Sequence, residues 1–290
     1  MVFGKNDKRF DLAAKFAISI FTAITFLVVL LVVMVSITDE SAIVENGYSF
    51  FPEKFSLDAY KMIFNDSTFS RSMFNSLFVT IFGTVLAVLI TALGAYGLAH
   101  PKVRYKAQLS MYFYITMVFT SGLVPWYLIC NSLNLKENYA ALIVPKLMFS
   151  VFNLFLVRNY MAGIDKAIME SAIIDGAGDF SVAFRIYLPI SKPVLATVAL
   201  FYSIDYWNDW YNAVMLVPFK QQFYPLQYLL FKLQNELSFL ELMQDSSLAV
   251  PPAESFKMAM AICTMGPIIL FYPFLQRYII KGIVMGAVKG

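Results

Sequence analysis

Long apolar runs dominate the pattern of hydrophobic and polar positions along the chain. A helix needs about 20 mostly apolar residues to cross the hydrocarbon core of a bilayer. Six runs come close to or exceed that length, and they cover residues 16–37, 74–99, 107–130, 139–157, 194–218 and 256–278. The first run lacks small residues typical of a cleavage site, so we expect a retained helix rather than a signal peptide. The pattern predicts an all-α membrane protein with six transmembrane helices.

The distribution of charge predicts how these helices are oriented. Basic residues near short loops stay on the cytoplasmic side of a membrane. They gather in the N-terminal tail, in the connection at residues 100–106 and in the C-terminal tail, whereas residues 39–71 and 220–254 are net acidic. We therefore expect both termini inside. This divides the chain into a cytoplasmic N-terminal tail (1–15), a transmembrane domain (16–278) and a cytoplasmic C-terminal tail (279–290).

Composition excludes several classes of protein. Of the 290 residues, 59% are hydrophobic and only 14% are charged, whereas soluble domains have about 25% charged residues. This excludes an ordinary soluble enzyme and a disordered chain, and a formal net charge of +3 gives no reason to expect binding to nucleic acid. With one histidine, His100, and two cysteines in apolar runs, Cys130 and Cys263, we expect no metal site and no catalytic triad.

The predicted cytoplasmic loop between the fourth and fifth runs, residues 162–189, has the pattern of two short helices. Asp165 can cap the first helix, and Gly176 can adopt the left-handed conformation that ends it. The second helix can begin at Asp179 and continue until the chain meets Pro189. Such a helix–turn–helix can dock into a groove of another protein. The alternative is a solvated loop that only joins two membrane helices.

The residues of this loop resemble the Glu-Ala-Ala loop of bacterial ABC importer permeases. The matching positions are Glu170, Ser171, Ala172, Asp175, Gly176, Ala177, Phe184, Leu188, Pro189 and Pro193. Serine at 171 stands where that family usually has alanine, and it is still small. Further segments resemble the carbohydrate branch, the group of the smaller maltose-importer permease: 122–125, 206–210, 225–227, 257–259, 276–282 and 286–290. The 225–227 segment and the long fifth connection, residues 219–255, are similar to those of permeases that import oligosaccharides cut from complex polysaccharides.

This resemblance implies a type I importer permease whose loop is a coupling helix in a cleft of a separate ATPase. Glu170 would meet a basic residue, Gly176 would allow the turn, and Ala172 and Ala177 would allow close approach. The implied ATPase-coupling residues are Glu170, Ser171, Ala172, Asp175, Gly176, Ala177 and Phe180. The chain has no Gly-x-x-x-x-Gly-Lys-Ser/Thr phosphate loop, so we expect a non-catalytic subunit that binds no cofactor, while the ATPase uses ATP and Mg.

The same resemblance implies the partners and the location of the protein. The expected partners are a second homologous permease, two ABC ATPase subunits, an extracellular sugar-binding protein, the lipid bilayer and an oligosaccharide substrate. No nucleic acid is expected. The expected location is the bacterial cytoplasmic membrane, as a multi-pass protein.

Polar residues in the fifth apolar run are candidates for the substrate pathway, because polar groups inside a bilayer usually face a cavity or a partner. They are Asp205, Trp207, Asn208, Asp209 and Asn212. Helical spacing predicts that Asp205, Asp209 and Asn212 share one face. Carboxylates, amides and aromatic rings suit sugars, but an interfacial aromatic belt packed on the partner permease is equally open. Lys146 is expected to reach the outer interface or to meet an acid.

Two alternative functions remain open at this point. An ion-driven secondary transporter would use a midplane carboxylate such as Asp205 and would show inverted repeats, of which we find none. An ABC permease for a non-sugar solute would share the coupling loop but not the carbohydrate-type segments.

Overall fold

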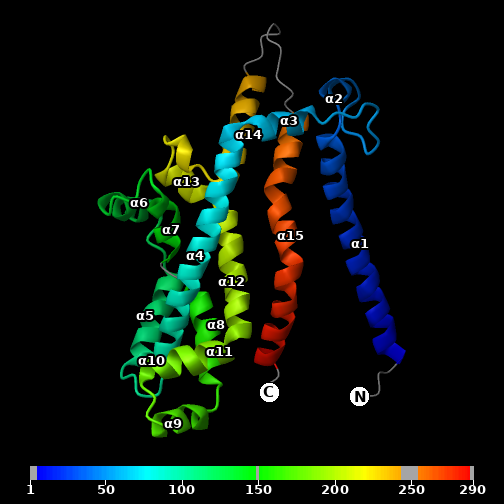
Figure 1. The fold of residues 1–290 in the computed structure, drawn as a ribbon. Helices are drawn as coiled ribbons and strands as arrows, with labels where there is room; N and C mark the ends of the chain where they lie inside the picture. Colours follow the sequence, from blue (N-terminus) through cyan, green and yellow to red (C-terminus); the bar gives the residue numbers. More distant parts are fainter. Residues whose placement is uncertain (1–4, 148–149, 243–253, 288–290) are drawn as a thin grey trace. The chain divides into compact units, whose positions relative to one another are not determined.

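The computed structural model describes residues 5–147, 150–242 and 254–287, and these residues form helices joined by loops, with no β-strand among them (Figure 1). The chain divides into two compact units. The first unit contains Met1–Ser67 and Lys232–Gly266, and the second unit contains Thr68–Phe231 and Pro267–Gly290. Helices α14 (Leu226–Leu242) and α15 (Glu254–Ala287) pass from one unit into the other.

The first unit begins with the long apolar helix α1 (Lys5–Ser36), followed by α2 (Glu40–Asn46) and α3 (Asp58–Asn65). Most side chains of the apolar stretch of α1 are exposed, as is expected of a helix that faces lipid. The helix already begins at Lys5, so most of the predicted tail 1–15 is helical. At the other end, the hydroxyls of Ser36 and Tyr60 lie 2.8 Å apart and hold α1 against α3.

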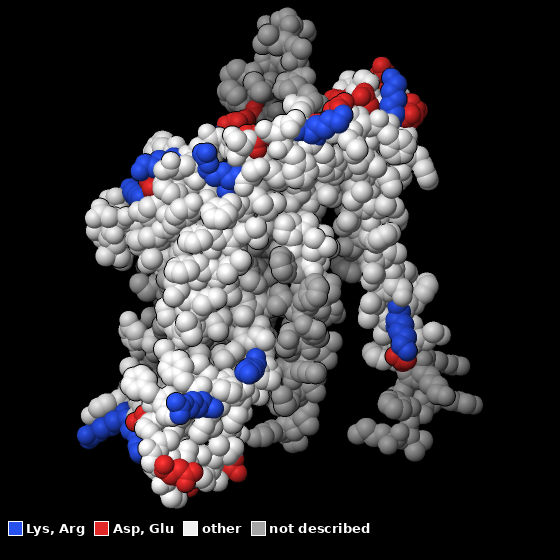
Figure 2. Space-filling model, viewed as in Figure 1, with Lys and Arg blue, Asp and Glu red and all other residues white. Residues whose placement is uncertain are grey.

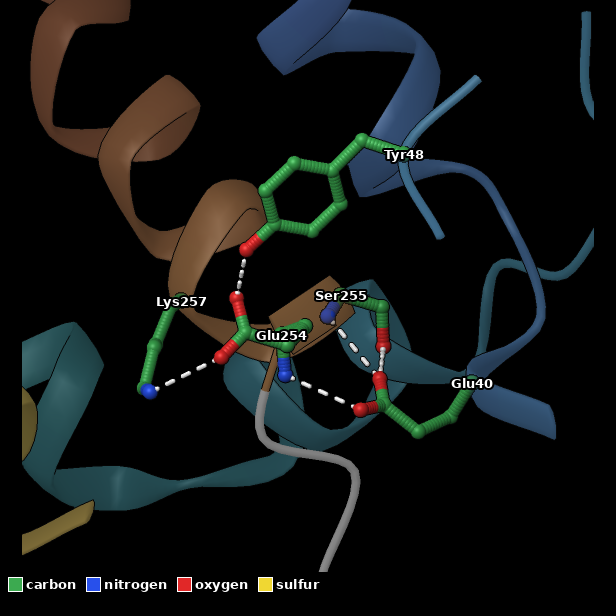
Figure 3. Close-up of polar contacts among 5 residues, drawn as sticks. All are labelled: Glu40, Tyr48, Glu254, Ser255 and Lys257. Atoms are coloured by element: carbon green, nitrogen blue, oxygen red, sulfur yellow. Dashed lines mark hydrogen bonds and ion pairs between the residues drawn. The ribbon is translucent and has the colours of Figure 1, made fainter. Parts of the chain in front are cut away.

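A polar cluster holds α2 against the start of α15 within the first unit (Figure 3). The Glu40 carboxylate accepts hydrogen bonds from the backbone N–H groups of Glu254 (3.1 Å) and Ser255 (2.9 Å), and from the Ser255 hydroxyl (2.7 Å). It thus satisfies donors that a helix N-terminus leaves unpaired. Glu254 in turn accepts from Tyr48 and from Lys257 (3.0 Å). Burial alone would raise the pKa of Glu254, but these two hydrogen bonds outweigh burial and lower the pKa.

The second unit is a bundle around α4 (Ser67–Ala99). Its other helices up to Phe231 are α5 (Lys106–Val118), α6 (Leu123–Ser132), α7 (Tyr139–Leu147), α8 (Val151–Ala162), α9 (Lys166–Ile174), α10 (Asp179–Val182), α11 (Leu188–Ile190), α12 (Lys192–Trp207) and α13 (Tyr211–Leu216), with a π-helical turn at Ala183–Tyr187 and a 3₁₀ turn at Gln221–Phe223. Its core brings together apolar side chains such as Leu154, Val157, Val198 and Leu216, all fully buried.

Helix α4 packs against the Tyr206 side chain of α12 at Gly83. A Cβ atom at this position would lie only 2.7 Å from the ring of Tyr206 on α12. The ring is 2% exposed, and its hydroxyl donates to the carbonyl of Ile143 at 3.2 Å. The missing side chain of Gly83 is therefore what makes room for Tyr206.

The charged side chains of the second unit are separated by an uncharged surface. On the face that Figure 2 shows, Lys, Arg, Asp and Glu lie at the two ends of this unit, and the stretch between them carries no charge. Exposed side chains of α4 include the apolar Phe74, Ile81 and Val85. A surface of this kind is stable in lipid rather than in water.

One end of the second unit is held by hydrogen bonds between distant segments. The Asn75 amide donates to the carbonyls of Gln222 (2.9 Å) and Tyr224 (3.0 Å) and accepts from the Tyr139 hydroxyl (2.7 Å). The Glu137 carboxylate accepts from the backbone N–H groups of residues 219 (3.0 Å) and 220 (2.8 Å). We call this end, made of residues 133–139, 216–226 and the start of α4, the pinned end.

The structure corrects several helix predictions. Among the described residues, two single helices, α1 and α4, are long and apolar enough to cross a membrane, and two bent pairs would bring the count to four. The prediction of one helix over 107–130 is wrong, because α5 and α6 meet at an angle of 113° after a turn at Gly122, whose φ is +80°. The predicted span 139–157 is likewise divided into α7 and α8.

Candidate functional site

The coupling segment, residues 162–190, begins as the sequence predicts. The Asp165 carboxylate accepts from the N–H of Ala167 at 3.0 Å and caps α9. The helix ends in a Schellman motif. Its two bonds run from the N–H of Gly176 to the carbonyl of Ile173 (3.0 Å) and from the N–H of Ala177 to the carbonyl of Ala172 (2.9 Å). Gly176 has a φ of +84°, so the predicted left-handed glycine is confirmed.

One face of α9 is anchored to the bundle. Met169 is 3% exposed, and its sulfur lies 4.0 Å from the hydroxyl of Tyr187, which is also buried. Ile173 and the half-buried Ala172 and Ala177 pack against the same core. The small size of the two alanines allows this close packing. They therefore serve the bundle itself, beside any contact with a partner.

The opposite face of the coupling segment combines apolar and acidic groups. Ile174 and Phe180 are 85% and 81% exposed. Glu170, Ser171 and Asp175 are exposed beside them, with the Ser171 hydroxyl donating to the carbonyl of Ala167 at 2.8 Å. Large apolar side chains exposed next to charges at the end of a bundle are typical of a surface that another protein covers.

The second helix of the segment begins at Asp179, as predicted, but does not end at Pro189. It continues from α10 through the π-helical turn into α11, which contains Pro189. Pro189 has no backbone N–H, so it donates no hydrogen bond to the preceding turn, and it lies close to the end of this continuous helix. The chain then bends by 79° into α12.

The predicted polar face of the fifth run is not formed. Helix α12 ends at Trp207, because Asn208 caps it and α13 begins only at Tyr211. Asp209 and Asn212 still pair, with 2.8 Å between Asn212 Nδ2 and Asp209 Oδ2, but the broken helix separates this pair from the face of Asp205. The break also removes the basis of the spacing argument, which required one continuous helix.

The other two predicted pathway residues have local partners. Trp207 is 4% exposed and therefore presents no open ring to a sugar. The Asn208 side chain accepts from Gln227 Nε2 at 3.1 Å and donates to the carbonyl of Ile204 at 2.9 Å. These contacts hold the end of α12 against the start of α14.

Asp205 lines a pocket of about 330 Å³ between α8 and α12. The other lining residues are Ser150, Phe152, Asn153, Phe201 and Ile204. Two phenylalanine rings whose centroids lie 6.5 Å apart stand beside a carboxylate, an amide and a hydroxyl. This combination offers apolar ring faces and hydrogen-bonding groups in one place, which is the chemistry that a sugar ring requires.

Sequence reasoning missed most of this pocket. Asn153 interrupts an apolar run and could have been found as a polar residue at membrane depth. Phe152 and Phe201 gave no such signal, because phenylalanine is common throughout the apolar runs. The side chain of Lys146, the other predicted intramembrane charge, lies outside the described residues.

Comparison with known proteins gives similarity over the whole chain. No family model matches it. A Bacillus subtilis protein named Protein LplC is 38% identical over 92% of this chain and 90% of its own length. The Bacillus subtilis polygalacturonan/rhamnogalacturonan transport system permease protein YtcP is 33% identical over 98% of this chain and 100% of its own length.

A solved structure agrees with these relatives. It is the crystal structure of a bacterial ABC transporter involved in the import of the acidic polysaccharide alginate. One of its chains superposes with a TM-score of 0.83 at 27% identity, covering 96% of this chain and 99% of that one. The fold of this chain is therefore similar to that of a chain in a solved ABC importer.

Proposed function

This chain belongs to the permease family of carbohydrate-importing ABC transporters, and we propose on that premise that it forms half of the translocation pathway of an ATP-driven oligosaccharide importer. It is a transport subunit rather than an enzyme, as its relatives are. In this proposal ATP and Mg are used by separate ATPase subunits, and this chain binds no cofactor. The observation that carries the proposal is the coupling segment, an anchored helix–turn–helix with an exposed apolar and acidic face.

The proposed topology has six crossings with both termini in the cytoplasm of a bacterium. The apolar helices α1 and α4, the two bent pairs and the uncharged surface of the second unit support a multi-pass protein of the cytoplasmic membrane. In this topology residues 16–278 form the permease domain, between the tails 1–15 and 279–290. The basic connection with Lys102, Arg104 and Lys106 follows His100, whose ring lies 3.8 Å from Asp179 of the coupling segment, as expected of the cytoplasmic side. We call this end of the second unit the coupling end.

The coupling segment is proposed to dock into an ATPase subunit through Glu170, Ser171, Asp175 and Phe180, with Ala172, Gly176 and Ala177 shaping the turn. Nucleotide binding can bias a membrane protein only through contacts that differ between its states. We propose that ATP-driven closure of an ATPase pair pulls this segment inward, so that the cavity opens outward. The anchoring of Met169 in the core gives the segment a rigid connection to the bundle.

The remaining partners follow from the family. A second homologous permease would complete the pathway, and an extracellular binding protein would deliver the sugar. The substrate class is proposed to be oligosaccharides cut from complex polysaccharides, because one relative is named for polygalacturonan and rhamnogalacturonan transport.

The pocket of Asp205, Asn153 and Phe201 is the proposed part of the substrate pathway in this chain. Of the residues predicted from sequence, Asp205 alone lines it, whereas Asn208, Asp209 and Asn212 are assigned to holding the chain around the break after α12. An Asp205→Asn substitution keeps the size of the side chain and removes its charge. We expect it to change the KM for uptake while leaving assembly intact, and an unchanged KM for every accepted sugar contradicts this assignment.

The decisive experiment measures sugar uptake and ATP hydrolysis by the complete transporter reconstituted in vesicles. Glu170→Lys reverses a charge on the proposed docking face, and Gly176→Pro prevents the left-handed turn and the hydrogen bond of its N–H. Both variants are expected to lose uptake that depends on ATP. Glu45→Lys, a charge reversal at an exposed acid of α2, is the matched control and should transport normally. Normal uptake by both coupling variants would contradict the mechanism.

The same vesicles test the secondary-transporter alternative. The proposal requires uptake to stop when ATP is removed and to continue when a protonophore collapses the ion gradient. The reverse result, or accumulation of sugar by vesicles that hold this chain alone, would show that it powers its own transport.

A further inference from the structure

His100, the single histidine of the chain, directly follows α4 and is followed by Pro101. Its N–H donates to the carbonyl of Tyr96 at 2.9 Å, so it extends the last turn of the helix. The residue is 8% exposed. A buried histidine at a helix end can serve only to cap the helix. Whether capping explains the burial of His100 depends on the hydrogen bonds of its two ring nitrogens.

The two ring nitrogens of His100 have different surroundings. Nδ1 accepts a hydrogen bond from the backbone N–H of Lys102 at 3.3 Å. A ring nitrogen that accepts carries no proton, so the neutral imidazole has its proton on Nε2. Nε2 is buried and has no hydrogen-bond partner among the described residues. His100 therefore carries a buried donor that the cap does not use, and such a donor is unfavourable until it finds an acceptor.

The Asp179 carboxylate is a suitable acceptor for the Nε2–H group of His100, but it lies too far away for a hydrogen bond. Oδ1 of Asp179, the first residue of α10, lies 3.8 Å from Nε2. A hydrogen bond between a nitrogen donor and a carboxylate has a length of about 2.7–2.9 Å. An approach of about 1 Å would therefore close this gap. The Asp179 side chain is 66% exposed, so no tight packing holds its carboxylate at the present distance.

A second contact joins the same two elements. The Tyr96 hydroxyl donates to the backbone carbonyl of Asp179 at 3.3 Å, and the Tyr96 ring packs edge-on against Tyr187 at a centroid distance of 5.2 Å. Tyr187 ends the π-helical turn, and short π-helical turns are frequent at functional sites. The end of α4 thus touches both the start of α10 and the turn that follows α10.

We propose that His100 is a positioning residue of the coupling step: its Nε2–H binds the Asp179 carboxylate in another state of the transporter and ties α4 to the coupling segment. This inference rests on the proposed coupling to an ATPase. In the present structure the side chain of Tyr96 holds α10 to α4 by a hydrogen bond. Closure of the second bond would make α4 move with α10, and Gly83 and Tyr206 would pass that movement to α12.

Substitutions at position 100 separate this role from that of a cap. The amide of His100→Gln reaches about as far as Nε2 and keeps a donor there, whereas the amide of His100→Asn lies at the position of Nδ1 and serves only the cap. His100→Leu removes both groups. In the reconstituted transporter, the ratio of sugar transported to ATP hydrolysed should fall about fivefold or more in the Leu and Asn variants and recover in the Gln variant.

Asp179 supplies the other half of the test. Asp179→Ala should lower the ratio as His100→Leu does, and the double variant should be no worse than either single variant, because both remove the same bond. The Lys102→Ala variant, which removes an exposed side chain next to the cap, should behave as the wild type. The inference is overturned when His100→Asn restores coupling and His100→Gln does not, or when Asp179→Ala couples normally.

A crosslinking experiment covers the case in which these variants fail to assemble. Cysteines at positions 102 and 178, both exposed and close in sequence to the pair, leave His100 and Asp179 in place; in a chain with Cys130→Ala and Cys263→Ala they are treated with a short bifunctional thiol reagent. The yield should differ between the nucleotide-free complex and the complex trapped with ATP and vanadate, and equal yields overturn the inference. A wild-type complex whose uptake is independent of ATP would instead refute the proposed function, so the two failures are distinguishable.

Discussion

The two ends of the second unit are built in opposite ways (Figure 1). At the pinned end, the buried Asn75 has three hydrogen-bond partners on two other segments, and Glu137 binds two consecutive backbone N–H groups. At the coupling end, the buried His100 has a donor without a hydrogen-bond partner among the described residues, and Phe180 is 81% exposed. The side chains of Asn75 and Glu137 are thus paired within the chain, whereas the coupling end presents groups that the described part of the chain does not cover.

This difference shows where the chain can move and where it cannot. A network of buried, fully paired polar groups has one stable arrangement, because any shift leaves a group unpaired. When the coupling end shifts against a partner, it does not lose hydrogen bonds of this kind. The comparison predicts that substitutions at the pinned end lower stability, whereas substitutions at the coupling end lower transport and leave stability almost unchanged.

Asn75→Ala is the strongest test of the pinned end. It removes three hydrogen bonds at a site that is 0% exposed, and at about 1 kcal/mol each we expect a loss of about 3 kcal/mol in stability. Thermal unfolding of the purified complex, followed by intrinsic fluorescence, measures the change. Asn131→Ala, at an exposed position of α6, is the control and should unfold within a degree or two of the wild type. Equal melting temperatures for both variants would remove the basis of the comparison.

Gly176→Ala tests the coupling end with a smaller change. No atom lies within 4 Å of the added Cβ, so the cost comes only from the φ of +84°, and a left-handed alanine costs about 1–2 kcal/mol. We expect uptake driven by ATP to fall strongly, while the melting temperature decreases by only a few degrees and less than in Asn75→Ala. Gly178→Ala is the matched control, because its φ of −74° suits any residue and its Cβ also has open space. A loss of uptake in both variants would show that the segment tolerates no side chain at all.

Glu137→Gln makes the smallest change at the pinned end. It keeps the shape of the side chain and one acceptor oxygen, so one of the two hydrogen bonds remains in a weaker form, but the other is lost because an NH2 group cannot accept from a backbone N–H. We expect a cost of about 1.5 kcal/mol. We expect a small decrease in melting temperature with normal coupling between ATP hydrolysis and uptake. A variant that melts normally but transports poorly would mean that the pinned end also takes part in the transport cycle.

Helices whose ends are determined by their own or neighbouring residues could be predicted from the sequence. Asp165 and Gly176 define the ends of α9 through a side-chain cap and a left-handed glycine, and both are visible as residue types at the right spacing. The apolar run of α1 was predictable because its cause, the hydrophobicity of its own residues, is local as well. The docking role of the coupling segment stays a prediction.

The elements whose cause is distant could not be predicted in this way. The break after Trp207 and the bend at Gly122 lie inside apolar runs that hydrophobicity alone reads as continuous. Asn153 of α8 and Asp205 of α12 line the same pocket, but the sequence of neither helix indicates that it packs against the other. Long-range packing decides such contacts, so the predicted face of Asp205, Asp209 and Asn212 was wrong although each residue was correctly seen as unusual in an apolar run.

The packing of the Tyr206 ring against Gly83 limits which substitutions such permeases can accept at these two positions as their sequences diverge. Because a single methyl group at position 83 would collide with the ring at 2.7 Å, sequence drift at these two sites is linked. A descendant can enlarge residue 83 only after residue 206 has become smaller. Where the aromatic ring persists, position 83 is closed to every side chain, however freely the neighbouring lipid-facing residues are exchanged.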